Sequence, residues 1–368
     1  MKVLITGANG FIAKNLIVTL NKIERISVLK YTKDDGVEKL KELIRESDFI
    51  FHLAGINRPV DNQEFYEGNS NLTQTLVDII TKENKKIPIV LSSSAQIGND
   101  SDYAKSKEQA EDIIKKYSDD NDVKCFIYRL PNVFGKWSKP NYNTVIATWC
   151  HNITRDIEIQ VNDKNVEMNL VYIGDVIHSF LDRLYVNNSD KLYYEIDNVY
   201  KKTLGEIEEL LYKFKDSRSN LLIPNIAKGF ERVLYATYLS FLPIDRFSYK
   251  LSGHEDARGT FYEILKTLDS GQLGISTTKP GITRGNHYHN TKNEKFLVIK
   301  GKALIELRDI FSKEIIQYNV DGNSLEIVEM IPGYTHNIKN TGDEEMVLLI
   351  WANENYDSKA PDTNFVEV

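Results

Sequence analysis

Tyr103 and Lys107 are four residues apart, a spacing that places both side chains on one face of a helix. The reduction of a ketone needs an acid that delivers a proton to the oxygen while it becomes an alkoxide. The ammonium group of Lys107 would stabilise a phenolate at Tyr103 and lower the pKa of the phenol from about 10 towards the working range. The pair is therefore predicted to be catalytic, with Tyr103 as the proton donor.

The Tyr-x-x-x-Lys spacing is not specific by itself. The chain contains 20 tyrosines, and Tyr262 and Tyr288 also precede a lysine by four residues. Tyr103 is distinguished by its place, shortly after the apolar segment 88–91 and the three consecutive serines at 92–94. In the dehydrogenase/reductase family that the chain resembles, as described below, this order marks the reactive tyrosine.

A second group of reactive side chains lies near the C-terminus and consists of His287, His289, Glu294 and His336. Imidazole and carboxylate groups are typical ligands of zinc, iron, manganese or nickel. In a strand, His287 and His289 would point to the same face. Three of the chain's seven histidines belong to this group, which favours a metal site over unrelated surface histidines. One divalent metal is predicted, with zinc as the expected ion.

A glycine turn follows the apolar segment 3–5 at the start of the chain. Such a turn lets backbone N–H groups and the N-terminus of the next helix bind a pyrophosphate. The alternative is an ordinary strand-to-helix turn, but its place at the start of a βαβ pattern favours a dinucleotide site. The cofactor contacts predicted here are Gly7, Asn9, Gly10, Phe11 and Ile12.

The end of the second expected strand bears on the choice of cofactor. NAD sites usually carry an acid about 20 residues past the glycine turn, where it binds the ribose 2′-hydroxyl. Here that place holds Lys30 and Lys33, with Asp34 and Asp35 only afterwards. Cations favour a 2′-phosphate, so NADPH is predicted, although both lysines could equally be solvated surface residues.

The elements that would position these residues follow two different patterns. From residue 2 to about 242, short β-branched runs alternate with segments of helical period, which predicts a Rossmann-like, doubly wound parallel sheet. The expected strands are 2–6, 25–31, 49–54, 88–92 and 123–130, and the expected helices are 12–22, 37–46, 71–83 and 105–117. The path from the second strand to the third omits a strand that many such sheets contain.

Beyond residues 243–248 the pattern changes to short alternating strands separated by glycine turns, which predicts an all-β barrel. The expected strands are 296–299, 303–308, 314–318, 325–330 and 346–351. Two domains are therefore predicted, an α/β domain over 1–245 and an all-β domain over 246–368.

The N-terminal motifs resemble those of the extended short-chain dehydrogenase/reductases. The resemblance is carried by Gly-x-x-Gly-x-x-Ala at 7–13 and by the segments 51–55, 68–73, 129–135 and 171–176. It implies that Ser94 holds the substrate carbonyl oxygen beside Tyr103 and Lys107. It also implies cofactor contacts from Leu53, Ala54, Tyr103, Lys107 and Asn132. By analogy Lys136, Trp137 and Asn143 would face the substrate, while Arg155 is either a diphosphate partner or a solvated surface residue.

The C-terminal motifs resemble two kinds of cupin. The segments 285–301 and 332–340 are similar to the two metal-binding cupin motifs, whereas 256–261 and 281–287 are similar to sugar 3,5-epimerases. The second resemblance implies that His287 is a general base. Since those epimerases usually lack a metal, His289, Glu294 and His336 depart from their pattern. The prediction is a metal bound by these three residues with His287 as base, and His287 as a fourth ligand is the alternative.

Over nearly its whole length the chain resembles the bifunctional reductase/epimerases of capsular polysaccharide biosynthesis, the CapF type. This resemblance implies that the cupin epimerises C3 of UDP-2-acetamido-2,6-dideoxy-4-hexulose. The reductase would then reduce C4 with NADPH to UDP-N-acetyl-6-deoxy-L-talosamine, a precursor of UDP-N-acetyl-L-fucosamine. One alternative is an NAD-retaining nucleotide-sugar 4-epimerase or dehydratase whose cupin is structural or dimerising. A non-catalytic redox sensor or assembly module is a further alternative.

Composition excludes several other classes. The net charge of −7 carries no basic block, which argues against a nucleic-acid partner. No apolar run reaches the length of about 20 residues that a membrane span needs, and the N-terminus lacks the features of a signal peptide. The chain has only two cysteines, with no Cys-x-x-Cys spacing, which fits a reducing compartment. A cytoplasmic enzyme is expected, and the resemblances described above imply a UDP-sugar substrate and a homodimer.

Overall fold

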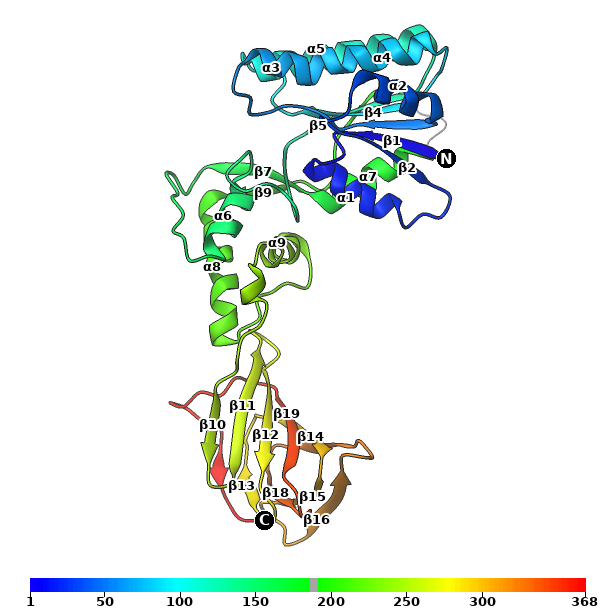
Figure 1. The fold of residues 1–368 in the computed structure, drawn as a ribbon. Helices are drawn as coiled ribbons and strands as arrows, with labels where there is room; N and C mark the ends of the chain where they lie inside the picture. The colour runs from blue at the N-terminus through cyan, green and yellow to red at the C-terminus, as the bar shows by residue number, and fades with distance from the viewer. Residues whose placement is uncertain (186–190) are drawn as a thin grey trace. The chain divides into compact units, whose positions relative to one another are not determined.

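The computed structural model describes residues 1–185 and 191–368, which form two compact units (Figure 1). The first unit comprises Met1–Tyr212 and Lys228–Pro243, and the second comprises Lys213–Ala227 and Ile244–Val368. The chain therefore passes between the units three times, and a short segment before residue 228 belongs to the second unit. The sequence analysis did not predict this exchange of segments.

The first unit is built on a sheet of parallel strands in the order β2-β1-β3-β4-β5-β8. The strands are β1 (Lys2–Thr6), β2 (Ser27–Tyr31), β3 (Phe49–His52), β4 (Ile89–Ser94), β5 (Cys125–Leu130) and β8 (Tyr193–Tyr194). Every residue of β3 and β4 is buried, as expected for strands covered on both faces. Because β2 and β3 lie on opposite sides of β1, a crevice opens at the carboxyl ends of β1 and β3.

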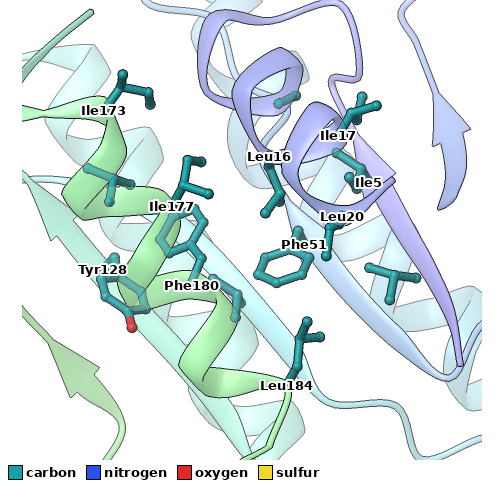
Figure 2. Close-up of a cluster of buried hydrophobic side chains, with 14 of the residues drawn as sticks. Ile5, Leu16, Ile17, Leu20, Phe51, Tyr128, Ile173, Ile177, Phe180 and Leu184 are labelled. Carbon is teal, nitrogen blue, oxygen red and sulfur yellow. The ribbon is translucent and has the colours of Figure 1, made fainter. Parts of the chain in front are cut away.

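Helices cover both faces of this sheet (Figure 1). One face carries α1 (Phe11–Leu20) and α7 (Ile173–Arg183), and the other carries α2 (Val37–Glu46), α4 (Leu72–Lys82) and α5 (Asp102–Asn121). Side chains of β3 alternate between the two cores, with Phe51 packed toward α1 and α7 and Ile50 on the opposite side. Figure 2 shows Phe51 between Leu16 of α1 and Phe180 of α7.

The remaining elements of the first unit are mainly short. They include a small sheet in the order β6-β7-β9. The elements are α3 (Gln63–Tyr66), the π-helical turn η1 (Glu67–Asn71), β6 (Asn132–Phe134), α6 (Val145–Ile153), β7 (Glu167–Tyr172), β9 (Tyr200–Thr203) and α9 (Gly229–Leu239). Helix α8 (Leu204–Asn220) starts in the first unit and ends in the second.

The second unit consists of two antiparallel sheets, in the orders β10-β11-β12-β19-β14-β17 and β16-β15-β18-β13-β20. Both sheets contribute to one apolar core, which includes Val298 and Leu348 from the first sheet and Ile305 and Ile338 from the second. The unit also contains the short helix η2. The elements are η2 (Ile244–Arg246), β10 (Gly253–Asp256), β11 (Gly259–Lys266), β12 (Gln272–Thr278), β13 (Thr283–Tyr288), β14 (Glu294–Lys300), β15 (Lys302–Asp309), β16 (Ile315–Asp321), β17 (Ile327–Met330), β18 (Tyr334–Asn340), β19 (Met346–Ala352) and β20 (Asn364–Phe365).

The predicted fold class is confirmed, since a doubly wound parallel sheet precedes an all-β part. The predicted helix over 37–46 coincides with α2, whereas α5 begins three residues before the predicted start at 105. The reason is a cap, because the Ser101 hydroxyl accepts a hydrogen bond from the N–H of Ala104. Within the described ranges, no helix is both long and apolar enough to cross a membrane.

Candidate functional sites

Ser94 and Tyr103 meet at the carboxyl end of β4, where α5 begins. The hydroxyl of Ser94 lies near enough to the phenol of Tyr103 to affect its pKa, and it accepts the N–H of Gln96 at 3.2 Å. Burial raises the pKa of Tyr103, with the Ser94 hydroxyl opposing that shift, so the lowering predicted from Lys107 is not found in this structure. The ring of Phe65 packs against Tyr103 with centroids 5.7 Å apart. The phenol is thus held beside a second hydroxyl that could bind the same carbonyl oxygen.

Lys107 lies one helical turn after Tyr103 and is buried, with 7% of its surface exposed. Its ammonium group donates to the carbonyl of Ser92 at 3.1 Å. Burial lowers the pKa of Lys107 to about 8, and the carboxylate of Glu111 opposes this shift. A side chain at Gly55 would bring its Cβ within 2.9 Å of the Lys107 Nζ atom, so the loop after β3 passes directly over the ammonium group.

Glu111 is a buried charge that the sequence analysis missed. It is 1% exposed, lies one turn beyond Lys107 on α5, and pairs with Arg129 of β5. The Arg129 Nε and Nη2 atoms donate to the carboxylate at 3.1 and 2.7 Å. The i,i+4 spacing of Lys107 and Glu111 was the available signal, because such pairs face one another on a helix.

Asn69 connects the loop after β3 to helix α5. It is the middle residue of the π-helical turn η1. Its side chain accepts the N–H of Ile56 at 3.1 Å and donates to the Ile56 carbonyl at 3.0 Å. It also donates to the hydroxyl of Ser106 at 3.0 Å. Because Ser106 directly precedes Lys107, these bonds fix the distance between the loop and the ammonium group.

A buried histidine ties the ends of β1 and β3 together. His52 Nδ1 is 2.7 Å from the Thr6 hydroxyl, and His52 Nε2 is 2.9 Å from the Thr73 hydroxyl. The Thr6 hydroxyl also accepts the N–H of Ala54 at 3.2 Å. Burial, with a smaller effect of the nearby Lys107 charge, lowers the pKa of His52 to about 3, so this histidine is neutral at physiological pH.

The predicted cofactor contacts surround the crevice between β1 and β3. Gly7 has φ +66°, and a Cβ atom there would lie 2.7 Å from the Cα of Ala54. Gly10 precedes α1 and no side chain caps this helix, which leaves the first N–H groups of the helix available to an anion. Asn9, Phe11 and Ile12 continue this turn, and Leu53 and Ala54 directly follow β3.

Three other predicted residues lie on β2, shortly after β2, and on β6. Lys30 and Lys33 are exposed at the end of β2. The carboxylate of Asp35 accepts both the N–H and the hydroxyl of Thr32 at 2.7 Å, so this acid is bonded within its own turn. The exposed Asn132 of β6 donates to the carbonyl of Asn169 at 3.3 Å.

Among the residues considered for substrate contact, some are exposed and one is bonded to the backbone. Lys136 stacks over the ring of Trp137 at 4.6 Å, and Asn143 is exposed. The guanidinium of Arg155 donates to the carbonyls of His151 and Phe241, at 3.1 and 2.9 Å. Arg155 is therefore partly engaged with the backbone of its own unit.

The four predicted metal-site residues come together in the second unit. One ligand atom from each of His287, His289, Glu294 and His336 lies within 4.8 Å of the others. His287 is on β13, opposite His336 of β18 in the ladder, and a bulge precedes His287. His289 follows β13 directly, and Glu294 is the first residue of β14. Strands β13 and β18 of one sheet and β14 of the other thus bring the four residues to one point.

Hydrogen bonds orient two of these histidines. His289 Nδ1 donates to the carbonyl of Asp362, and His336 Nδ1 faces the carbonyl of Tyr334 at 3.4 Å. The Nε2 atoms of both rings are buried without a hydrogen-bond partner, 3.5 and 3.6 Å from the Glu294 carboxylate. Buried imidazole nitrogens without partners, beside a carboxylate, fit a divalent metal.

His287 is the most accessible member of this group. Burial lowers its pKa to about 4, helped by the neighbouring His336 and His289. It is therefore a neutral imidazole at physiological pH, a form that suits both a ligand and a base.

The segments that resemble those of the sugar epimerases contribute to one charged network. Arg284 of β13 donates to the Thr278 hydroxyl at 3.2 Å and lies 3.7 Å from Asp256. Asp256 in turn pairs with Arg258 at 2.6 Å. The network brings the two epimerase-like segments together at β10 and β13.

Comparisons with known proteins agree with both halves of this architecture. The profile of the NAD dependent epimerase/dehydratase family matches residues 3–190, and the polysaccharide biosynthesis C-terminal domain matches residues 254–364. A Pseudomonas aeruginosa protein, UDP-2-acetamido-2,6-beta-L-arabino-hexul-4-ose reductase, is 47% identical over 99% of this chain and 98% of its own length.

Solved structures show the same relationship. The capsular polysaccharide assembling protein CapF from Staphylococcus aureus is 46% identical, covers 100% of both chains and gives a TM-score of 0.94. The UDP-glucuronic acid 4-epimerase of Bacillus cereus is 18% identical, with a TM-score of 0.57 over 66% of this chain and 96% of its own, and this likeness concerns the fold alone. The chain therefore belongs to the NAD dependent epimerase/dehydratase family and carries a polysaccharide biosynthesis C-terminal domain.

Proposed function

We propose that this protein is a bifunctional UDP-sugar enzyme of capsular polysaccharide synthesis. Its first unit would reduce the C4 ketone of a UDP-2-acetamido-2,6-dideoxy-4-hexulose, and its second unit would epimerise C3 of the same sugar. The observation that carries the reductase proposal is the placement of Ser94 at the end of β4 beside Tyr103 of α5, one helical turn from the buried Lys107. The 47% identical relative that is named for reducing such a hexulose supports the substrate class.

In the proposed reduction, the ketone oxygen accepts hydrogen bonds from Ser94 and Tyr103. NADPH, when bound, supplies the hydride for the carbonyl carbon. Tyr103 gives its phenolic proton to the oxygen, so that the ketone becomes an alcohol, and the positive charge of Lys107 stabilises the resulting phenolate. The crevice between β1 and β3, with the uncapped N-terminus of α1, fits the cofactor pyrophosphate.

NADPH is preferred over NADH because of the charges at the end of β2. Lys30 and Lys33 are exposed there, where a 2′-phosphate would lie, and Asp35 is turned toward Thr32. Comparing the KM for the two cofactors tests this preference, since replacement of both lysines by serine should raise the KM for NADPH and leave that for NADH unchanged.

The proposed epimerisation takes place in the second unit, at the metal-site residues. His289, Glu294 and His336 would hold one divalent metal, expected to be zinc, which supplies positive charge beside the substrate. His287 would take the C3 proton, which is acidic because the C4 ketone is adjacent. Epimerisation must therefore precede reduction, since the alcohol product no longer activates C3.

His287 also remains a candidate fourth ligand, because its ligand atom lies within 4.8 Å of the other three. Elemental analysis of two variants separates the roles. His336→Ala should lose the metal in either case, whereas His287→Ala should keep it if His287 is the base and lose much of it if His287 is a ligand. Full metal retention in His336→Ala would contradict the metal site.

The reductase is tested by following NADPH absorbance with the UDP-4-keto sugar and, as a control, with the 4-hydroxy UDP-N-acetylhexosamine. Consumption of NADPH with the 4-keto sugar, but not with the 4-hydroxy sugar, supports the proposal. An NAD-retaining 4-epimerase with a structural cupin would instead convert the 4-hydroxy sugar without net consumption of cofactor.

Homodimer formation is also proposed, and light scattering of the native protein tests it.

A further inference from the structure

The last residues of the chain lie against the strands that carry the metal-site residues. Strand β20 pairs with β13 at His287 and Tyr288. The N–H of Val366 donates to the Asn286 carbonyl at 3.0 Å, and the Thr335 hydroxyl donates to the carbonyl of Val366. Asn286 and Thr335 are the direct neighbours of His287 and His336 in sequence. The segment 362–367, called the C-terminal strap below, is thus bonded next to two of the four candidate ligands.

Asp362 begins this strap and binds the loop between the other two ligands. Its carboxylate accepts the backbone N–H groups of Asn290, Thr291 and Lys292 at 2.9, 2.8 and 2.9 Å. It also accepts the side chains of Asn290 and Thr291, at 3.0 and 3.2 Å. Successive N–H groups that converge on one carboxylate form an anion-binding nest, which fixes the backbone of the loop. This loop joins His289 to Glu294.

The same residue contacts a ligand through its backbone. The Asp362 carbonyl accepts the Nδ1–H of His289, and a carbonyl can only accept, so the proton of His289 stays on Nδ1. The Nε2 lone pair is then free to face the metal. In addition, the Lys292 ammonium lies 2.9 Å from Glu294 Oε1, while Glu294 Oε2 faces the two Nε2 atoms.

We propose that Asp362 is a positioning residue for the metal site and that the C-terminal strap sets the metal affinity. The carbonyl of Asp362 fixes the tautomer and ring orientation of His289. Its carboxylate fixes the loop that spaces His289 from Glu294. This inference rests on the proposed metal site and adds to it a residue 73 positions away in sequence from the ligand that it orients.

The test uses Asp362→Ala and Asp362→Asn in the full-length protein, with zinc affinity measured by competition with a chelating dye. Both substitutions change the carboxylate contacts to the loop and keep the backbone carbonyl behind His289, and loss of such outer contacts at a metal site typically weakens metal binding by about 10–100-fold. We expect Asp362→Ala to weaken zinc binding within this range and Asp362→Asn, which keeps one acceptor oxygen, to weaken it less. Asp321→Ala is the matched control, because Asp321 also accepts two backbone N–H groups, from Asn323 and Ser324, at the end of a strand away from the metal-site residues.

Thermal unfolding of the metal-free variants separates positioning from general stability. Asp362→Asn should unfold close to the wild type without metal and gain less stability when zinc is added. Zinc affinity equal to that of the wild type in both Asp362 variants would overturn the proposal. If His336→Ala bound zinc as tightly as the wild type, the metal site itself would be refuted, a result distinct from unchanged affinity in the Asp362 variants alone.

Discussion

Tyr103 should have the largest effect on the rate of the proposed reduction, because it supplies the proton. General acid catalysis typically contributes about 10²–10⁴-fold to a rate. Tyr103→Phe keeps the ring packed on Phe65 but removes the proton, so kcat for NADPH oxidation should fall within this range. Exchange of the C3 hydrogen with solvent should continue, since it belongs to the second unit.

Tyr262→Phe is the matched control for this substitution, because Tyr262 also precedes a lysine by four residues but lies on β11. It should leave NADPH oxidation unchanged. If Tyr103→Phe abolished both activities, the proposed division of labour would be wrong.

Lys107 predicts how the reductase depends on pH. Its pKa is lowered to about 8 by burial, and the proposed mechanism needs the charged form, so kcat/KM should decrease as the pH rises through 8. Glu111 raises the pKa of Lys107, so Glu111→Gln should move this decrease to lower pH. A pH profile that stays in place, or moves to higher pH, would contradict the assignment. The Tm of Glu111→Gln shows whether loss of the ion pair with Arg129 destabilises the protein.

At the scale of elements, the turn between β1 and α1 depends on Gly7. Its φ of +66° is strained for other residues, and an added Cβ would lie 2.7 Å from the backbone of Ala54. Gly7→Ala should therefore open the turn and raise the Kd for NADPH at least about tenfold, a change of roughly 1.4 kcal/mol. Gly36→Ala is the control, because Gly36 also precedes a helix but has a φ of −81° and nothing within 4 Å of the added atom. Fluorescence titration should give it the affinity of the wild type.

Local patterns were sufficient to predict strands β1–β5 and helices α1, α2, α4 and α5, but not the long-range partners of these elements. The apolar periodicity of 37–46 is a property of the segment alone, and α2 matches it. The spacings of Tyr103 from Lys107 and of His287 from His289 are likewise local. By contrast, Asp362 meets His289 across 73 residues, and no periodicity or spacing records such a contact. Glu111 was missed because one carboxylate in a helix resembles a surface residue until its burial is known.

The chain passes between the two units more than once, so no single boundary residue separates the two units of the whole molecule. The segment 213–227 belongs to the second unit, where Ile223 donates to the Lys266 carbonyl at 2.8 Å and Lys266 donates to the Leu221 carbonyl at 2.7 Å. Arg218 donates to the Arg246 carbonyl at 2.6 Å. A fragment that begins at 246, the predicted boundary, lacks all of these bonds.

A fragment over 213–368 should consequently have a higher Tm than one over 246–368, and circular dichroism measures both. Zinc should raise the Tm of the longer fragment if its metal site is intact. Equal melting temperatures would show that the segment 213–227 adds nothing to the second unit and would favour the boundary predicted from sequence.

One incubation follows both proposed reactions together. The protein is incubated with NADPH and UDP-2-acetamido-2,6-dideoxy-4-hexulose in deuterated water, while cofactor absorbance and product mass are followed. The account predicts one NADPH consumed per product and one solvent deuterium retained at C3. NADPH consumption without deuterium in the product would contradict a reductase joined to an epimerase and leave the second unit without a catalytic role.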